Sequence, residues 1–479
     1  MEEDLLTKFL KLMSTDITDD DLELIKLGHS LGLDLVSFAE LRASQEDNYT
    51  DDVRVMALKR LEKGNEHTLK TIDSFYVGSI DFMVSDRPEG KKYFLLETNG
   101  GSHRGLSILT KKQQGLLYDG YYEAIIQATI CSTSKDERVI VLIGVPVNDG
   151  LIHEKVIMIE YLRKKLKSNG ISVKIFNTDN YDNQFNAKIL LLIADYRQLS
   201  TTLSFSQNWI KYKGDKVSVI IGDGITRRFN NTEFTNLIKN DFNKIRSIIV
   251  NSIFRITDDK SLTYLASFFS KEALQKYNLK YLIFTKAYDE KELVNKLKFL
   301  LKHYNKSFII KPNGGSGGAG VMPVSKGEDY KNIKNIIEES KNEFFAKFME
   351  DRNPYPYTIQ EMADFALIDW QEGKHTFDLR IYLAQRNRKV YPIGGLARIA
   401  RGEYSGNLNK QEFVVNLSGF DGKIEVFRGL GISVKNSSLL NLEKEDFVNM
   451  FCIGCVLFAS MVNNYQKIMN FSGWDKIID

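Results

Sequence analysis

The spacing of apolar residues changes along the chain and predicts different kinds of segment. Residues 1–75 place apolar side chains three and four positions apart, as in LELIKLGHSLGLDL, which predicts helices. From Phe75 the pattern alternates, in FYVGSIDFMV and again in KKYFLLETN, and the polar stretch SDRPEG between them predicts a turn. We therefore expect a helical N-terminal cap, a β-hairpin, and then a helix from about Ile108 to Ala128.

The next part of the chain, residues 136–252, consists of short runs rich in Val and Ile. These runs are VIVLIGVPV, SVKIFN, AKILLLIAD, KVSVIIGDG and RSIIVNS. Helical segments are expected between them, one from His153 to Asn169 and another between AKILLLIAD and KVSVIIGDG. This alternation predicts the buried parallel sheet of a Rossmann-like α/β domain. The turn after the first run is GVPVNDG and not GxGxxG, so a dinucleotide site there has little support.

Helices and strands are mixed in residues 253–479. We expect helices to about His303, a strand ending at Lys311, and a helix around 333–345. Further strands are predicted in YTIQEMADF, HTFDLRIYLAQ and KVYPIGGLARIA, with EFVVNLSGFDG beyond them and a C-terminal helix over about 443–468. The whole chain is therefore expected to be an α/β protein of several lobes (α+β, multi-lobed), divided into residues 1–75, 76–135, 136–252 and 253–479.

Composition narrows the class of protein. The 479 residues are 43% hydrophobic, with only 7 Pro, which excludes a disordered or collagen-like chain. The net charge of +3 gives no strong field, so neither nucleic acid nor a membrane is an expected partner. The lysine-rich stretches 291–302 and 326–341 alternate with acidic residues and are interpreted as solvated helix faces.

The cysteines and the apolar stretches bear on location. Three cysteines cannot form a disulfide framework in a chain this long, which indicates a reducing compartment. The start, MEEDLLTKFLKLM, lacks the basic region of a signal peptide, and the apolar stretch Met450–Val462 is too short to span a membrane. We expect a cytoplasmic protein. Cys452 and Cys455 lie within an apolar helical pattern without a second ligand pair, so core packing is preferred to zinc.

The strongest local signal for chemistry is IIKPNGGSGGAGV, a strand that ends in Lys311 and a glycine-rich loop. Glycines let backbone N–H groups approach an anion, and the lysine adds a positive charge. A flexible linker is the alternative, but phosphate binding is preferred. The loop is not a Walker A motif, because it lacks GK[ST]. The candidate phosphate-binding residues are Lys311, Gly314, Gly315, Ser316, Gly317 and Gly318.

A second signal lies on the predicted hairpin. Glu97 and Asn99 are two positions apart on a strand, so both side chains project to one face, and a paired strand can bring Asp81 beside them. Carboxylate and carbonyl oxygens are the ligands that Mg²⁺ takes together with nucleotide phosphates. Polar residues at a fraying strand end are the alternative. Arg380 and Arg398 follow apolar strand residues, where they would contact a phosphate or a carboxylate, or would form structural ion pairs.

With these residues in view, SIDFMV and FLLETNGG resemble the ATP-grasp superfamily of carboxylate-amine ligases. In its D-alanine:D-alanine ligases, an R-I-D strand and an L-L-E-x-N strand carry the ligands of two Mg²⁺ ions. The resemblance implies that Asp81, Glu97 and Asn99 bind metal. One departure is Ser79, which stands where those ligases have arginine, so the role of that arginine would fall to Arg104 or Arg380.

The order of the motifs is inverted, because the metal strand precedes the lysine and the glycine loop. The chain therefore resembles the circularly permuted members of the superfamily, such as eukaryotic-type glutathione synthetases. Residues 138–252 resemble the pre-ATP-grasp domain, and DDK resembles the opening of the permuted ATP-grasp region, which implies that Lys260 faces the phosphates. TIQEMAD resembles the hinge strand that reads adenine, which implies contacts from Gln360, Glu361, Met362 and Ala363.

Three later motifs, DLR, GGLAR and VVN at 414–416, extend the resemblance over most of the chain. They imply catalytic roles for Arg380 and Arg398, and Arg104, in the loop after the metal strand, is the third candidate catalytic residue. A second departure follows VVN, where LSGFDGK replaces the glycine-rich serine run of the permuted bacterial proteins.

The expected activity is that of an ATP-dependent carboxylate-amine ligase, which forms an amide or peptide bond through an acylphosphate. Its cofactors would be ATP and Mg²⁺, with Mn²⁺ as the alternative metal. Its partners would be small carboxylate and amine substrates such as amino acids or peptides, and a homodimer is compatible with the sequence. Two alternatives stay open: a kinase on the same scaffold and a nucleotide-binding protein without turnover.

Overall fold

The computed structural model describes most of the chain after residue 47. The described residues are 48–72, 74–100, 105–131, 137–145, 152–178, 181–195, 199, 202–222, 244–315, 317–348, 353–406, 409–413, 415, 417 and 426–478. The helices expected before residue 48 lie outside them. Within the predicted cap, the helix α4 (Tyr49–Gly64) is present.

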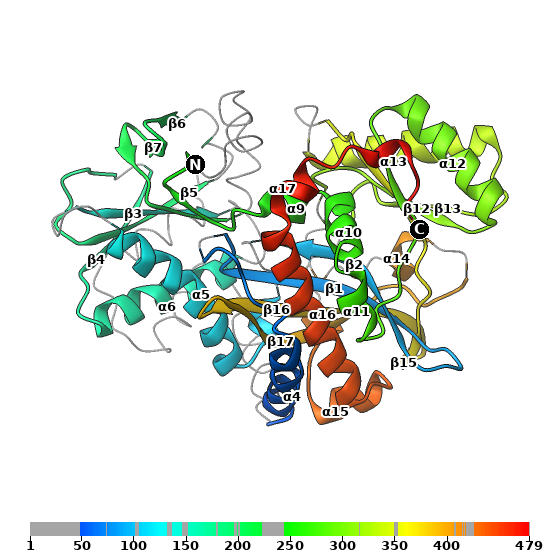
Figure 1. Cartoon of the computed structure of the whole chain (residues 1–479), viewed down its shortest axis with the longest axis horizontal. Helices are drawn as coiled ribbons and strands as arrows, with labels where there is room; N and C mark the ends of the chain where they lie inside the picture. Colours follow the sequence, from blue (N-terminus) through cyan, green and yellow to red (C-terminus); the bar gives the residue numbers. More distant parts are fainter. Residues whose placement is uncertain are drawn as a thin grey trace.

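A six-stranded antiparallel sheet forms the centre of the molecule (Figure 1). Its strands are β1 (Val77–Ser85), β2 (Lys92–Asn99), β15 (Leu367–Trp370), β16 (Gly373–Arg386), β17 (Lys389–Ile399) and β18 (Gly429–Gly431). The order is β18-β17-β16-β1-β2, with β15 paired to β16. The predicted hairpin β1–β2 is confirmed, and it pairs with β16, a strand from much later in the chain.

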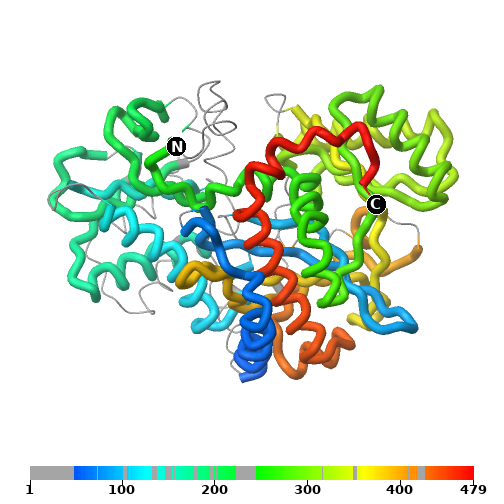
Figure 2. The backbone as a smooth tube through the Cα atoms, viewed as in Figure 1, coloured from blue at the N-terminus to red at the C-terminus, as the bar shows by residue number. Residues whose placement is uncertain are grey.

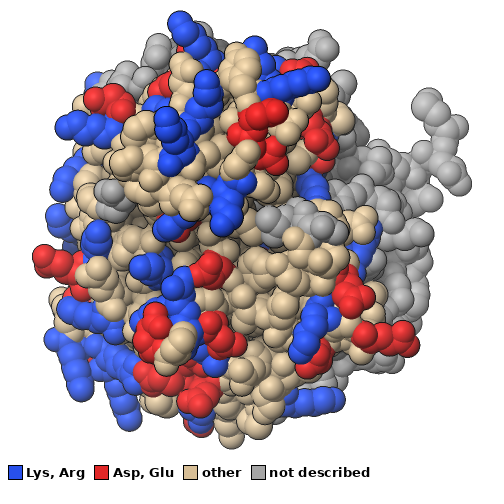
Figure 3. Space-filling view, turned by 90° about the vertical axis from the view of Figure 1, so that its right-hand side faces the viewer, with Lys and Arg blue, Asp and Glu red and all other residues tan. Residues whose placement is uncertain are grey.

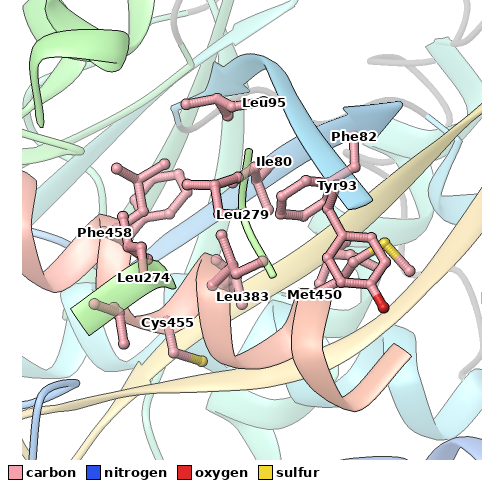
Figure 4. Packing of buried hydrophobic residues seen from close by; sticks show 14 of the residues in the cluster. Ile80, Phe82, Tyr93, Leu95, Leu274, Leu279, Leu383, Met450, Cys455 and Phe458 are labelled. Atoms are coloured by element: carbon pink, nitrogen blue, oxygen red, sulfur yellow. The ribbon is translucent and has the colours of Figure 1, made fainter. Parts of the chain in front are cut away.

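One face of this sheet is apolar and is covered by helix α16 (Lys444–Asn463). Ile80 on β1 and Leu383 on β16 point to this helix, and Phe458 of α16 packs beside them (Figure 4). Cys452 and Cys455 are fully buried in the same cluster, so the prediction that they pack in the core is confirmed. Each fully buried large apolar side chain contributes roughly 1.5–3 kcal/mol.

The predicted C-terminal helix is two helices. α16 ends at Asn463, and the short helix α17 (Tyr465–Met469) follows. Within the described part of the chain, α16 is the one helix whose length and composition would allow it to cross a membrane, and 94% of its most apolar window is buried inside the protein. A helix that is apolar on all sides is expected in such a position.

A parallel sheet of five strands lies beside the central sheet. It contains β3 (Val139–Val145), β4 (Val173–Asn177), β5 (Ile189–Asp195), β9 (Val219–Ile221) and β10 (Ile248–Val250), in the order β10-β9-β3-β5-β4. The predicted parallel pairing of the Val- and Ile-rich runs is confirmed. Helix α5 (Lys111–Ile130) lies between the two sheets, and α6 (Ile152–Ser168) packs against α5 and the parallel sheet.

The prediction of a helix between β5 and β9 is wrong. That stretch forms a three-stranded antiparallel sheet of β6 (Leu203–Ser206), β7 (Trp209–Tyr212) and β8 (Asp215–Lys216). Its side chains alternate between buried and exposed, as a strand requires. Gln207 and Asn208 both have positive φ, 53° and 66°, which is the backbone of a tight hairpin turn.

A smaller lobe is built on a four-stranded antiparallel sheet, with strand order β11-β14-β12-β13. The strands are β11 (Phe284–Ala287), β12 (Phe308–Lys311), β13 (Met322–Val324) and β14 (Tyr357–Glu361), and the helices α12 (Glu290–Tyr304) and α13 (Tyr330–Phe348) cover it. β11 falls where only helices were expected before His303, so that prediction is wrong. A run as short as FTKA has no periodicity that separates strand from buried helix.

The remaining elements connect these layers. They are α9 (Phe254–Asp258), α10 (Lys260–Phe268), α11 (Lys271–Gln275), α14 (Lys410–Phe413), α15 (Val434–Leu439) and the 3-10 turns η1 (Leu106–Ile108), η3 (Val426–Arg428) and η4 (Gly473–Asp475). After α17 the chain crosses to the smaller lobe (Figure 2), where Ile478 pairs with Phe284 of β11. On the face that carries this lobe, basic and acidic side chains are interspersed (Figure 3), as expected for solvated helix faces.

Candidate active site

The second face of the central sheet carries polar residues in rows across neighbouring strands. Asp81 on β1 lies opposite Glu97 on β2 and opposite Arg380 on β16, and Asp378 lies opposite Arg398. Directly opposite residues in an antiparallel pair share a face. The structure thus brings together Asp81, Glu97, Arg380 and Arg398, which the sequence predicted as one site.

Two arginines and two aspartates form a buried network on this face. Arg380 donates to Asp81 from Nε at 2.7 Å and from Nη2 at 2.6 Å, and Arg398 Nη2 donates to the same carboxylate at 2.7 Å. Arg398 also donates to Asp378, from Nε at 2.8 Å. All four residues are buried. Both arginines therefore form the ion pairs that were the alternative interpretation, and the network as a whole is neutral.

The pKa values of the two aspartates are shifted in opposite directions. Burial by itself would raise the pKa of both carboxyl groups, because it disfavours the charged form. At Asp81 the charges of Arg380 and Arg398 outweigh burial and hold the pKa below its usual range. At Asp378 burial is the largest effect, and the pKa is raised. Asp81 is thus held as a carboxylate between two guanidinium groups.

Glu97 lies at the solvent-exposed end of the network. Its side chain is 33% exposed and its Oε2 is 3.2 Å from Nζ of Lys260. Lys260 is the first residue of α10, and the preceding Asp259 caps that helix by accepting hydrogen bonds from Ser261 and Leu262. Lys286 pairs with Asp259 at 2.7 Å, so the start of α10 is fixed.

Asn99 and Ser79 lie opposite each other on β2 and β1. Within the part of the chain that the structure describes, Nδ2 of Asn99 and Oγ of Ser79 are buried without a hydrogen-bond partner. Buried polar atoms of this kind call for an explanation such as an ion, water or ligand. This observation supports a ligand beside the network.

Lys311 lies at the inner end of the site with its amino group among three oxygen atoms. Nζ is 2.6 Å from Oε1 of Gln360, 2.8 Å from the hydroxyl of Tyr264 and 3.2 Å from the carbonyl oxygen of Leu96. Burial, followed by the positive charge of Lys260, lowers the pKa of Lys311 to about 7. Sequence reasoning missed Tyr264, although its position four residues after Lys260 places both on one helix face.

An apolar cavity opens next to Lys311, between the hairpin and the smaller lobe. It is partly open to solvent. Its lining contains all four predicted adenine-contacting residues, Gln360 to Ala363. The other lining residues are Met83, Leu96, Ile309, Lys311, Pro323, Phe365 and Phe413. Its mostly apolar lining, with a few polar groups at one end, is of the kind that binds a flat aromatic ring such as a nucleobase.

The glycine-rich loop connects β12 to β13 beside this cavity. Gly314, Gly317 and Gly318 have positive φ, a conformation that glycine adopts without strain. Glu343 of α13 accepts a hydrogen bond from the backbone N–H of Gly320 at 3.1 Å and pairs with Lys410 of α14. Gly315 is described as well, whereas Ser316, Arg104, Val414 and Asn416 lie outside the described residues.

The hairpin carries the three predicted ligands of Mg²⁺. The described residues contain no group of three or more His, Cys, Asp or Glu side chains that could hold a metal. Two carboxylates and one amide oxygen, from Asp81, Glu97 and Asn99, fit an ion that keeps several water or phosphate ligands. Of these, Glu97 is the most accessible, because Asp81 is paired with both arginines.

Comparisons with known proteins give structural likeness without sequence similarity. No protein-family model matches the chain, and no curated protein matches it. A glutathione synthetase-like effector (GSS30) from Globodera pallida is similar over 76% of this chain and 82% of that chain, with 11% identity and a TM-score of 0.36. The D-alanyl-alanine synthetase A of Vibrio cholerae is similar over 64% of this chain and 78% of that chain, with 11% identity and a TM-score of 0.32. These TM-scores are too low to define the fold of the chain.

Proposed function

We propose that the protein is an ATP-dependent carboxylate-amine ligase with a circularly permuted ATP-grasp fold. One observation carries the proposal: an apolar cavity ends at a buried lysine, and a cluster of acidic and basic side chains from the hairpin, α10 and β16–β17 begins beside it. Nucleotides need both environments, an apolar one for the base and a charged one for the phosphates. The apolar cavity would therefore bind the base, and the charged cluster would bind the phosphates and a metal ion.

In this proposal the adenine lies in the cavity between Met83 and Ile309, with Phe365 and Phe413 on its walls. The backbone N–H and C=O groups of Gln360 to Ala363 form hydrogen bonds with the edge of the adenine ring. The phosphates extend towards Lys311 and Lys260 and are covered by the glycine-rich loop, with contacts from Gly314, Gly315, Ser316, Gly317 and Gly318. The loop excludes water, which protects an acylphosphate from hydrolysis.

The metal would be held by Glu97 and Asn99, with Asp81 as the third predicted ligand. Bound Mg²⁺ neutralises the charge that spreads over the transferring phosphoryl group. Arg380 and Arg398, together with Arg104, are proposed to contact the carboxylate or the transferred phosphate. Arg380 and Arg398 would do so by exchanging hydrogen bonds that they now make to Asp81 and Asp378.

The proposed reaction has two steps. An oxygen of the substrate carboxylate attacks the γ-phosphorus, the bond to ADP breaks, and an acylphosphate forms. A neutral amine then attacks the acyl carbon, the carbon–oxygen bond to phosphate breaks, and the amine loses a proton as the amide forms. Side chains hold the reactants in line, which is the main contribution of a protein to phosphoryl transfer.

The strand order supports the permutation. The hairpin of the proposed metal site, from the first quarter of the described chain, pairs with β16, which carries Arg380. In the proposed division, 76–135 and 253–479 build the ATP-grasp lobes, 136–252 is a Rossmann-like pre-ATP-grasp domain, and 1–75 is a cap. All three cysteines are free thiols, which supports a cytoplasmic location.

The experiment is Mg²⁺-dependent release of ADP and phosphate in the presence of pooled amino acids and short peptides, with mass spectrometry of the products. A ligase gives free phosphate and a new mass equal to two substrates minus water. A phosphorylated product would instead identify a kinase. The variant Glu97→Gln, which keeps the buried pairs of Asp81 with both arginines, is the control in which release should nearly stop.

A further inference from the structure

We propose that Tyr264 is a positioning residue, whose hydroxyl fixes the amino group of Lys311 at the inner end of the cavity. The inference rests on the proposed function, because it assigns Lys311 to a nucleotide. Tyr264 belongs to none of the motifs in the sequence. It lies in α10, and its side chain reaches the point where the hairpin, β12 and β14 meet.

The hydroxyl group of Tyr264 is needed because it can accept a hydrogen bond from Lys311 and donate one of its own. The ammonium group of Lys311 has three hydrogens, and three oxygens surround it, those of Tyr264, Gln360 and Leu96. A phosphate would replace the longest contact, that of 3.2 Å to Leu96, while Tyr264 and Gln360 retain the other two hydrogens. The phenol can accept from Lys311 while its own hydrogen goes to Oε1 of Gln360, at 2.6 Å, or to the carbonyl of Leu96. A phenyl ring could do neither.

Burial makes these contacts strong. Tyr264 is 4% exposed, Lys311 6% and Gln360 2%. A buried ammonium group has lost its water, so each hydrogen bond to it contributes more than one between neutral groups. The charged groups facing Lys311 are Lys260, which repels it, and Glu97, which attracts it.

The position of Tyr264 is itself fixed. Its ring packs edge-on against Phe284 of β11, with 5.5 Å between ring centroids. Helix α10 is capped at its start by Asp259, and Lys260 begins the same helix. One helix therefore places both lysines of the site, Lys260 through its backbone and Lys311 through the hydroxyl of Tyr264.

The same contacts join two sheets. Leu96 belongs to β2 of the central sheet, whereas Lys311 and Gln360 belong to β12 and β14 of the smaller lobe. Lys311 and Tyr264 both bind the carbonyl oxygen of Leu96. The distance between the two walls of the cavity is thus set at the amino group that would meet the phosphates.

The test is a double-mutant cycle on the full-length protein, with Tyr264→Phe, Lys311→Met and the double variant. Equilibrium dissociation constants are measured for MgATP and for adenosine. We expect Tyr264→Phe to weaken MgATP binding about tenfold, the equivalent of one hydrogen bond to a charged group. It should leave adenosine binding nearly unchanged and have no further effect in the protein that already carries Lys311→Met.

Tyr93→Phe is the matched control. Tyr93 is another buried tyrosine, whose hydroxyl donates to Asp446 at 2.7 Å on the apolar side of the sheet. The same chemical change there should leave both dissociation constants as in the wild type. An equal loss from Tyr264→Phe in the wild-type protein and in the Lys311→Met variant would overturn the inference, as would an equal loss for MgATP and adenosine.

Failure of the proposed function would look different. If the wild-type protein binds no MgATP, the nucleotide assignment is wrong. The same four proteins are then compared by urea unfolding. Non-additive free energies of unfolding for Tyr264→Phe and Lys311→Met would still support the positioning of Lys311, and additive values would overturn it.

Discussion

Asp81 and Arg380, 299 positions apart in the chain, face each other on adjacent strands and are joined by two hydrogen bonds of 2.7 and 2.6 Å. Arg398 binds the same carboxylate from the next strand. The residue predicted as a metal ligand is thus also the centre of the buried charge network. The contribution of Asp81 to stability can be measured apart from metal binding, because the free energy of unfolding is determined without nucleotide or metal.

Asp81→Asn leaves the buried network with two guanidinium groups and one carboxylate, that of Asp378. We expect the free energy of unfolding to fall by about 3–5 kcal/mol, since an uncompensated buried charge is strongly destabilising. Urea unfolding of the protein without added nucleotide or metal measures it. The control is Asp369→Asn, which breaks the exposed pair with Lys374 and should cost about 1 kcal/mol or less. Equal losses would contradict the account of the network.

Glu97→Gln should separate metal binding from stability. Glu97 is partly exposed and pairs with Lys260 at 3.2 Å and more loosely with Arg380 at 3.8 Å, so its loss should lower the free energy of unfolding by about 1 kcal/mol or less. Mg²⁺-dependent ADP release should fall by about 100-fold or more, because the metal supplies several kcal/mol of stabilisation in the transition state. Glu372→Gln, at an exposed position, is the control. Normal turnover by Glu97→Gln would remove Glu97 from the metal site.

Phe413→Ala should remove one wall of the cavity. We expect MgATP and adenosine to lose affinity alike, by about tenfold, because stacking of a base on an aromatic ring contributes about 1–3 kcal/mol. Lys311→Met should weaken MgATP alone. Binding titrations with both ligands distinguish the two effects, and Phe427→Ala, an exposed phenylalanine, is the control. An unchanged adenosine affinity in Phe413→Ala would place the base elsewhere.

His67 should make the fold sensitive to acid. Its side chain is fully buried, and neither ring nitrogen has a hydrogen-bond partner among the described residues. Burial, followed by the charge of Lys389, lowers the pKa of His67. The folded state therefore favours neutral His67, and the unfolded state takes up the proton more readily, so stability is full above the ordinary histidine pKa and is lost as pH falls below it.

The measurement is the free energy of unfolding in urea at about pH 7.5 and about pH 5, on either side of the ordinary histidine pKa. Wild-type protein should lose more stability over this interval than His67→Leu, which cannot take up a proton. The other titrating groups are common to both proteins and cancel in the comparison. The same loss in both would show that His67 does not contribute.

The sequence was most informative where strand periodicity alone decides which residues meet. Glu97 and Asp81 were placed on one face because strand side chains alternate, and the register of β1 and β2 places them opposite each other. Tyr264, Phe365 and Phe413 were not predicted. Tyr264 comes from a helix, Phe365 follows the end of β14 and Phe413 ends α14, so their positions depend on how the lobes pack.

Two errors in the fold have a similar cause. The strands β6 to β8 alternate clearly, but they are short, and their turn depends on Gln207 and Asn208 adopting positive φ, which neither residue type demands. β11 is recognisable only through its pairing with β14. The pairing of both arginines with Asp81 was also invisible, because the sequence does not give the register between β1 and β16.

The transfer of carboxylate oxygen to phosphate tests the central claim most directly. The protein is incubated with Mg²⁺, ATP and pooled amino acids whose carboxylates carry ¹⁸O, and the released phosphate is analysed by mass spectrometry. An acylphosphate route predicts phosphate that contains one ¹⁸O atom, because the carbon–oxygen bond breaks when the amine attacks. Phosphate without ¹⁸O, or none released from any pool while ATP binds, would contradict a carboxylate-amine ligase.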